Sequence, residues 1–166
     1  MTDTTRFAFH VLGTPRPQPR PRFVKGRAVS TGSDKAKLWR AEVERVCRRA
    51  VERLGEPPLF VGPVRVTLLF TFQKPVVYQA SNPKRFRELA AGAQPRADVD
   101  NLAKLAMDVM ERCGVFGNDR MVSILSASKV YGDKSSMAVL VEALGGQESV
   151  EPVSRRDAPP KWLTRS

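Results

Sequence analysis

Two carboxylates stand two residues apart in the segment ADVDNLAK, residues 97–104. Asp98 and Asp100 lie where an extended segment is expected to turn into a helix, so both side chains can converge beside the free N–H groups of the first turn. Carboxylates this close repel each other unless a cation or a proton resolves the repulsion. Magnesium suits the position because it takes oxygen ligands and is often held by one or two carboxylates together with substrate phosphates. The spacing therefore indicates metal-assisted chemistry on a phosphate.

Two further residues extend this candidate site. Lys104 lies one helical turn after Asp100, where it can pair with that carboxylate or, in a phosphodiesterase, hold the scissile phosphate. Asp119 occurs in the turn FGND and is a third metal-ligand candidate if the strand that follows runs back beside the start of the helix. A structural alternative stays open for each acid, because Asp commonly caps helices and occurs in turns. Asp108 is expected to be a solvated partner of Lys104.

Other catalytic patterns are missing from the sequence. His10 lies in an expected strand without an evident Ser or Cys partner, which argues against a hydrolase triad. No GxxxxGK[ST] or GxGxxG motif indicates a nucleotide-binding loop. Cys47 and Cys113 support neither a disulfide framework nor a zinc site, and we expect both to be buried as small apolar residues in a reducing compartment.

The charge of the chain favours a polyanionic partner. The 166 residues include 28 Lys and Arg against 17 Asp and Glu, a formal net charge of +11. Clustered cations gain affinity by releasing counterions from a phosphate backbone. No apolar run approaches the length of a membrane span, and no signal peptide is evident near Met1. We therefore expect a cytoplasmic protein that acts on nucleic acid and not at a membrane.

The elements that must position the acids form one domain, residues 1–145, of the α/β (α+β) class. Hydrophobic periodicity and capping residues predict the order β-α-β-α-β-β, with a mixed sheet of about four strands flanked by two main helices. We expect a strand at residues 6–13, a helix from the N-cap Ser33 to Gly55, a strand at 64–72, a helix at 100–112 capped by Gly114, and a hairpin of strands at 121–131 and 136–144.

Three segments stand apart from these elements. Residues 14–29, TPRPQPRPRFVKGRAV, carry four alternating prolines that favour an extended, polyproline-like path, and we call this segment the basic arm. Residues 74–97 are expected to form a long connection with a possible short helix at 83–91, and residues 146–166 a disordered polar tail. The candidate phosphate contacts of the basic arm are Arg16, Arg20, Arg22, Lys25 and Arg27.

The segment from Pro95 to Gly132, with its D-x-D-N-L-x-K helix start, resembles the RusA-type Holliday junction resolvases, small endodeoxyribonucleases often encoded in prophages. An early GTPRPQPRPR segment and the predicted element order share the resemblance, which covers about residues 7–144. An acid 19 residues after the second Asp of the motif makes the combination specific. Many relatives carry two adjacent acids in that turn, whereas here Asn118 precedes Asp119.

The resemblance implies a homodimer that uses Mg²⁺ or Mn²⁺ to cut branched DNA, above all the four-way junction, in recombination and repair. It implies that Asp98, Asp100 and Asp119 bind the metal and that Lys104 is the catalytic lysine. Two alternatives stay open: a non-enzymatic module that binds nucleic acid, and a nuclease of the same fold that prefers flaps or single-stranded DNA.

Overall fold

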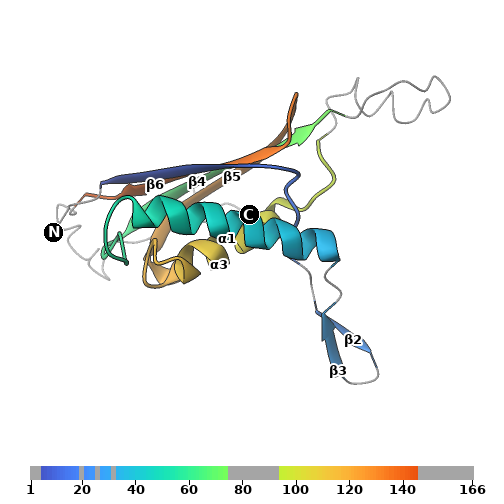
Figure 1. The fold of residues 1–166 in the computed structure, drawn as a ribbon, viewed down its shortest axis with the longest axis horizontal. Coiled ribbons are helices and arrows are strands. Elements are labelled where there is room, and N and C mark those ends of the chain that lie inside the picture. Colours follow the sequence, from blue (N-terminus) through green and yellow to red (C-terminus); the bar gives the residue numbers. More distant parts are fainter. Residues whose placement is uncertain (1–4, 19–20, 25–26, 31–32, 75–93, 146–166) are drawn as a thin grey trace, which may run out of the picture.

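A four-stranded mixed sheet forms the centre of the computed structural model, which describes residues 5–18, 21–24, 27–30, 33–74 and 94–145. The strand order is β1–β6–β4–β5, and only the pairing of β4 with β5 is parallel. Both long helices lie on the same side of the sheet (Figure 1). The strands are β1 (Arg6–Leu12), β4 (Val64–Gln73), β5 (Val122–Gly132) and β6 (Ser136–Ala143), and the helices are α1 (Asp34–Glu52) and α3 (Val99–Arg112).

The core lies between the sheet and the two helices. Alternate residues of β1, β4 and β6 are buried, as the period of two along a strand requires when one face is covered. The apolar faces of α1 and α3 complete this layer, and the alternation and the two-helix architecture confirm the expected fold class. The largest fully buried side chains are Phe7, Phe70, Phe116, Leu68, Leu102, Leu105, Met110 and Met137.

The two cysteines belong to this core, as predicted. Cys47 on α1 and Cys113 at the end of α3 are both free and buried. The Sγ atom of Cys113 donates a hydrogen bond to the carbonyl oxygen of Glu44, 3.7 Å away, so the two helices meet at this point. The pKa of Cys47 is raised, chiefly by its hydrogen bond with Cys113 and also by burial. The same hydrogen bond lowers the pKa of Cys113.

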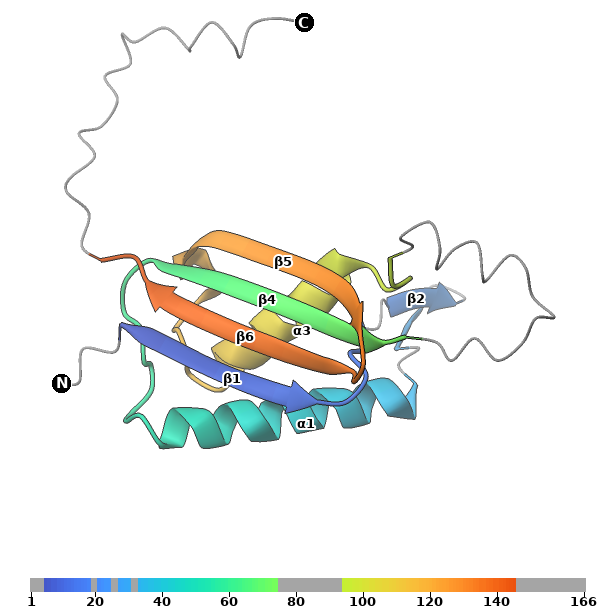
Figure 2. The same ribbon diagram turned by 90° about the horizontal axis from the view of Figure 1, so that it is seen from above.

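The predicted hairpin of the last two strands is wrong, because β4 lies between β5 and β6 (Figure 2). The chain leaves β4, passes through α3 and returns as β5, and such a crossover makes the two strands parallel neighbours. The loop after β5 then passes around the end of β4. There the Lys74 N–H donates to the Gly132 carbonyl at 2.9 Å, and the Gln73 N–H donates to Ser135 Oγ at 2.8 Å.

The basic arm does not follow a polyproline-like path throughout, which corrects the expectation for residues 14–29. It contains the antiparallel strands β2 (Pro21–Val24) and β3 (Arg27–Ser30). The alternating prolines end at Pro21, the first residue of β2, so the residues after it can donate ladder hydrogen bonds. Pro15 and Pro17 fall outside the strands, where the polyproline-like expectation applies, and Pro19 lies outside the described residues.

The remaining boundaries follow the sequence with small differences. Ser33 is the N-cap of α1, and its Oγ accepts from the Ala36 N–H at 3.3 Å, as predicted. The helix ends at Glu52, before Gly55. Gly114 follows α3 with a φ of 77°, a left-handed conformation that glycine adopts readily. The possible short helix at 83–91 and the tail at 146–166 lie outside the described residues.

Candidate active site at the start of helix α3

Asp98 is the N-cap residue of α3, but its carboxylate does not cap the helix. Its backbone is extended, and its side chain makes no hydrogen bond to the N–H groups of the first turn. Instead, Asp98 Oδ2 accepts a hydrogen bond from Asn101 Nδ2 at 3.3 Å. The capping explanation therefore applies to the backbone of Asp98 and leaves the function of its exposed carboxylate to be explained.

Asp100 and Lys104 lie one turn apart on α3, and both side chains are exposed. The sequence suggested that Lys104 pairs with Asp100 or with Asp108. In the part of the chain that the structure describes, Lys104 forms neither ion pair. Its ammonium group therefore has all three N–H donors available to an anion, beside the first-turn carboxylates.

The basic arm is attached to the helix that carries these acids. The backbone N–H of Gln18 donates to the carbonyl oxygen of Asn101 at 3.2 Å. Gln18 Oε1 is buried and has no hydrogen-bond partner within the described ranges. This contact brings the start of the arm, including the half-buried Arg16, beside the first turn of α3. An arm of high positive charge thus begins where the two acids lie.

The other predicted phosphate contacts are described only in part. Arg22 lies in β2 opposite Val29, and Arg27 lies in β3 opposite Val24. Arg20 and Lys25 lie outside the described residues. Figure 1 shows β2 and β3, and Figure 2 shows β2, at the end of the molecule where α3 begins.

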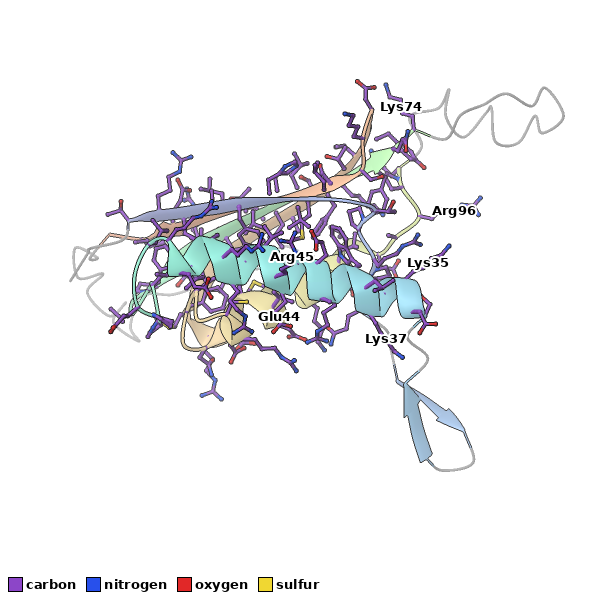
Figure 3. The ribbon with its side chains drawn as sticks, in the orientation of Figure 1. Lys35, Lys37, Glu44, Arg45, Lys74 and Arg96 are labelled. Atoms are coloured by element: carbon purple, nitrogen blue, oxygen red, sulfur yellow. The ribbon has the colours of Figure 1, made fainter. Side chains whose placement is uncertain are left out.

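Further basic residues that the sequence analysis missed gather at the same end. Figure 3 shows Lys35, Lys74 and Arg96 projecting there from the start of α1, the end of β4 and the segment before α3. They are far apart in the sequence, so no local charge run could have indicated them. Their positions add positive charge at the end of the molecule where the arm lies.

Lys129 is another residue that the sequence analysis missed. It lies on β5, and its Nζ donates to the carbonyl oxygen of Ala97 at 2.8 Å. No local sequence signal pointed to it, because its position depends on the parallel pairing of β5 with β4, in which its partner is the core residue Phe70. The strand after Asp119 therefore does run back beside the start of α3, as the sequence suggested.

Asp119 itself lies at the other end of α3. It begins a 3₁₀ turn, η1 (Asp119–Met121), which leads into β5. Helix α3 has 14 residues and lies between Asp98 and this turn, and a helix of that length is about 20 Å long. Asn118 has a structural role here, because its Oδ1 accepts from the Arg120 N–H at 2.9 Å. One chain thus does not bring Asp119 to Asp98 and Asp100.

The donor chemistry of the acid pair fits a hard divalent cation. Carboxylate oxygens suit Mg²⁺ and Mn²⁺, and Asp98 and Asp100 are exposed at the start of α3, where substrate and water can reach them. Among the described residues, no group of three His, Cys, Asp or Glu side chains is placed to hold a metal. A site built on one chain would therefore have two carboxylates, an arrangement that Mg²⁺ accepts when substrate phosphate and water complete its shell.

No helix within the described ranges is long and apolar enough to cross a lipid bilayer. In the comparison with protein families, the model of the family described as endodeoxyribonuclease RusA matches residues 13–142. The matched region contains the arm, both helices, the acid pair, Lys104 and Asp119. No curated protein matches the chain.

Proposed function

The chain belongs to the RusA family of endodeoxyribonucleases, and on that premise we propose that it cuts branched DNA at a Mg²⁺ or Mn²⁺ site that includes Asp98 and Asp100. The family makes the chain a crossover junction endodeoxyribonuclease, which excludes the non-enzymatic alternative. The observation that carries the metal proposal is the exposed acid pair, in which the Asp98 carboxylate leaves the helix uncapped.

The surroundings of the pair suit a phosphodiester. A bound Mg²⁺ or Mn²⁺ would supply Lewis acidity and positive charge to the scissile phosphate. Lys104, one turn further along α3 and without an ion pair to a described residue, would hold the same phosphate and neutralise charge that develops during cleavage. The arm and the basic residues beside it would bind the flanking backbone.

The test is cleavage of a synthetic four-way junction by Asp100→Asn. The variant should lose at least two orders of magnitude in cleavage rate with Mg²⁺ or Mn²⁺, while junction binding is kept or becomes tighter, because a negative charge facing phosphate is removed. Asp108→Asn is the matched control, because it removes the same charge from the same helix two turns further along. Unchanged cleavage by Asp100→Asn would contradict the proposal.

The preferred substrate is the four-way junction, with a flap as the alternative. A two-fold dimer carries two equivalent sites, and paired cuts across a junction need two sites in one complex. Cleavage rates on a junction, a flap, single-stranded DNA and a linear duplex, measured with one preparation, distinguish these substrates. A faster rate on flaps or single strands would identify the alternative.

We propose that the enzyme is a homodimer in which strand β5 pairs with β5 of a second copy. Strand β5 is the edge of the described sheet beside β4, and it has 11 residues. A long edge strand with free backbone groups readily pairs with another chain. Ile124 and Leu125 point to opposite faces of the sheet and are 39% and 48% exposed. A second copy would cover apolar side chains on both faces.

Antiparallel pairing of the two β5 strands would also unite the three acids. The start of one strand would lie beside the end of the other. Asp119 precedes the start of β5, and the Lys129 contact with Ala97 puts the first turn of α3 near its end. Asp119 of the second copy would then approach Asp98 and Asp100. This arrangement reconciles the acid set implied by the family resemblance with the separation of these acids within one chain.

A further inference from the structure

Lys129 is an exception in the pattern of strand β5. On the side of the sheet that faces the helices, its neighbours along the strand are Ala127 and Tyr131. Its parallel partner on β4 is Phe70, a fully buried core residue. Placing an ammonium group on such a face is unfavourable unless the group finds hydrogen-bond acceptors. The half-buried position of Lys129 therefore needs an explanation from its partner.

That partner is the backbone immediately before the acid pair. Lys129 Nζ donates to the Ala97 carbonyl oxygen at 2.8 Å, a bond that joins residues 32 positions apart in the sequence. A charge-assisted hydrogen bond of this length is stronger than one between neutral groups. The bond holds the peptide between Ala97 and Asp98 against the edge strand of the sheet.

The backbone at this position has no side-chain cap to fix it. Asp98 does not bond to the first-turn N–H groups, and its carboxylate contacts only Asn101 among the hydrogen bonds seen for it in the described residues. The direction in which the Asp98 carboxylate points thus depends on how the chain approaches the helix, and Lys129 holds that approach. Loss of a contact that orients a metal ligand without touching the metal typically lowers metal affinity by about 10–100-fold.

We propose that Lys129 is a positioning residue that fixes the Ala97–Asp98 peptide and so sets the geometry of the Asp98 and Asp100 carboxylates for the metal. This inference rests on the proposed function, because it assumes that the two carboxylates bind a cation. It assigns to β5 a second role beside the proposed dimer contact: the strand carries the side chain that supports the metal ligands.

The test compares Lys129→Met, Lys129→Arg and the control Lys134→Met. Lys134 is exposed in the loop after β5, so its replacement removes the same charge without the Ala97 contact. Mn²⁺ binding is measured by electron paramagnetic resonance on the protein without DNA. We expect the dissociation constant for Mn²⁺ to rise about tenfold in Lys129→Met, to return close to the wild-type value in Lys129→Arg, and to be unchanged in Lys134→Met.

Amide hydrogen exchange supplies a readout that needs no metal. The Leu102 N–H donates to the Asp98 carbonyl at 3.1 Å, which makes it a reporter for the first turn of α3. Its exchange should be faster in Lys129→Met than in wild type and unchanged in Lys134→Met. If Lys129→Met does not fold, Lys129→Gln provides the same comparison with a shorter side chain that keeps an N–H donor.

Two results would overturn the inference. One is a dissociation constant for Mn²⁺ that does not rise in Lys129→Met. An unchanged value would show that Lys129 does not support the metal ligands, and a lower value would show that it acts only as a competing positive charge. The other is unchanged exchange of Leu102. Failure of the proposed function looks different, because wild-type protein would then neither bind Mn²⁺ nor cut a junction, while the exchange result would still report on the Lys129 contact.

Discussion

Asp98 and Asp119 lie at opposite ends of helix α3, so the acids that the family resemblance groups together are separated within one chain. Two carboxylates remain at the start of the helix, and the third follows its end. Because of this separation, the set of acids in the metal site depends on how two copies of the chain associate. If all three acids bind one cation, two copies must contribute to each site.

Mixed dimers test this directly. Asp100→Asn and Asp119→Asn homodimers should both be inactive on a four-way junction. A dimer with one copy of each variant keeps one site with Asp98 and Asp100 from one subunit and Asp119 from the other. We therefore expect tagged heterodimers, purified after coexpression, to recover cleavage at one site and to release nicked junctions. The measurement is strand-specific cleavage of an end-labelled junction.

A matched combination provides the control. A dimer of Asp98→Asn with Asp100→Asn places one defective carboxylate in each site under any arrangement, so it should stay inactive. Sites built within one subunit predict no recovery in either heterodimer. An inactive Asp100→Asn and Asp119→Asn heterodimer would therefore exclude the shared site.

The edge of β5 provides the second prediction. Leu125→Glu would place a charge in the seam between two β5 strands, where it would lose solvation without a partner. We expect the dimer dissociation constant to rise at least tenfold, measured by sedimentation equilibrium, and cleavage to fall in proportion to the loss of dimer. Leu38→Glu is the control, because Leu38 is 70% exposed on α1, away from β5. Equal weakening by the two variants would argue against the β5 seam.

Much of this fold could be predicted from local sequence patterns. The alternation of Val64, Val66, Leu68 and Phe70 fixed the face of β4, and Ser33 marked the start of α1, because each signal depends on residues close in the chain. The order of strands in the sheet, by contrast, depends on contacts between residues far apart in the chain. The loop that joins β5 to β6 is short enough for a hairpin. No local sequence pattern shows that β4 lies between these two strands.

The candidate site divides in the same way. Asp98, Asp100 and Lys104 share one helix start, so their proximity follows from helical spacing. The distance of Asp119 depends on which way β5 runs relative to α3, and the contact of Lys129 with Ala97 depends on the same packing. Both are long-range relationships that periodicity does not encode. The alternating prolines predicted a polyproline-like path for the whole arm. Their effect stops at Pro21, where the hairpin begins.

The basic arm gives the third prediction, on DNA affinity. Replacing its cations by Gln should weaken junction binding and reduce the slope of log K against log salt concentration by about 0.9 for each phosphate that the variant no longer neutralises. The measurement is a binding titration at several salt concentrations without divalent metal. A control that removes five cations from other elements should leave most of the slope intact. The arm variant changes Arg16, Arg20, Arg22, Lys25 and Arg27, and the control changes Arg45, Arg49, Arg53, Arg65 and Arg112. Equal slopes for the two variants would show that only total charge matters.

The last prediction concerns the turn that carries the chain from α3 to Asp119. Gly114 has a φ of 77°, and a Cβ added there would overlap the side chain of Pro57. Gly114→Ala should therefore lower the free energy of unfolding by about 1–3 kcal/mol, because it combines left-handed strain with a steric clash. Gly117→Ala is the matched control in the same turn, because an added Cβ there meets nothing within 4 Å. Urea unfolding followed by circular dichroism gives both values.

If Asp119 acts at the active site, Gly114→Ala should also slow cleavage under conditions where the protein is fully folded, because the Pro57 clash displaces the start of that turn. Equal stability of the two alanine variants would show that the turn accommodates a side chain at Gly114.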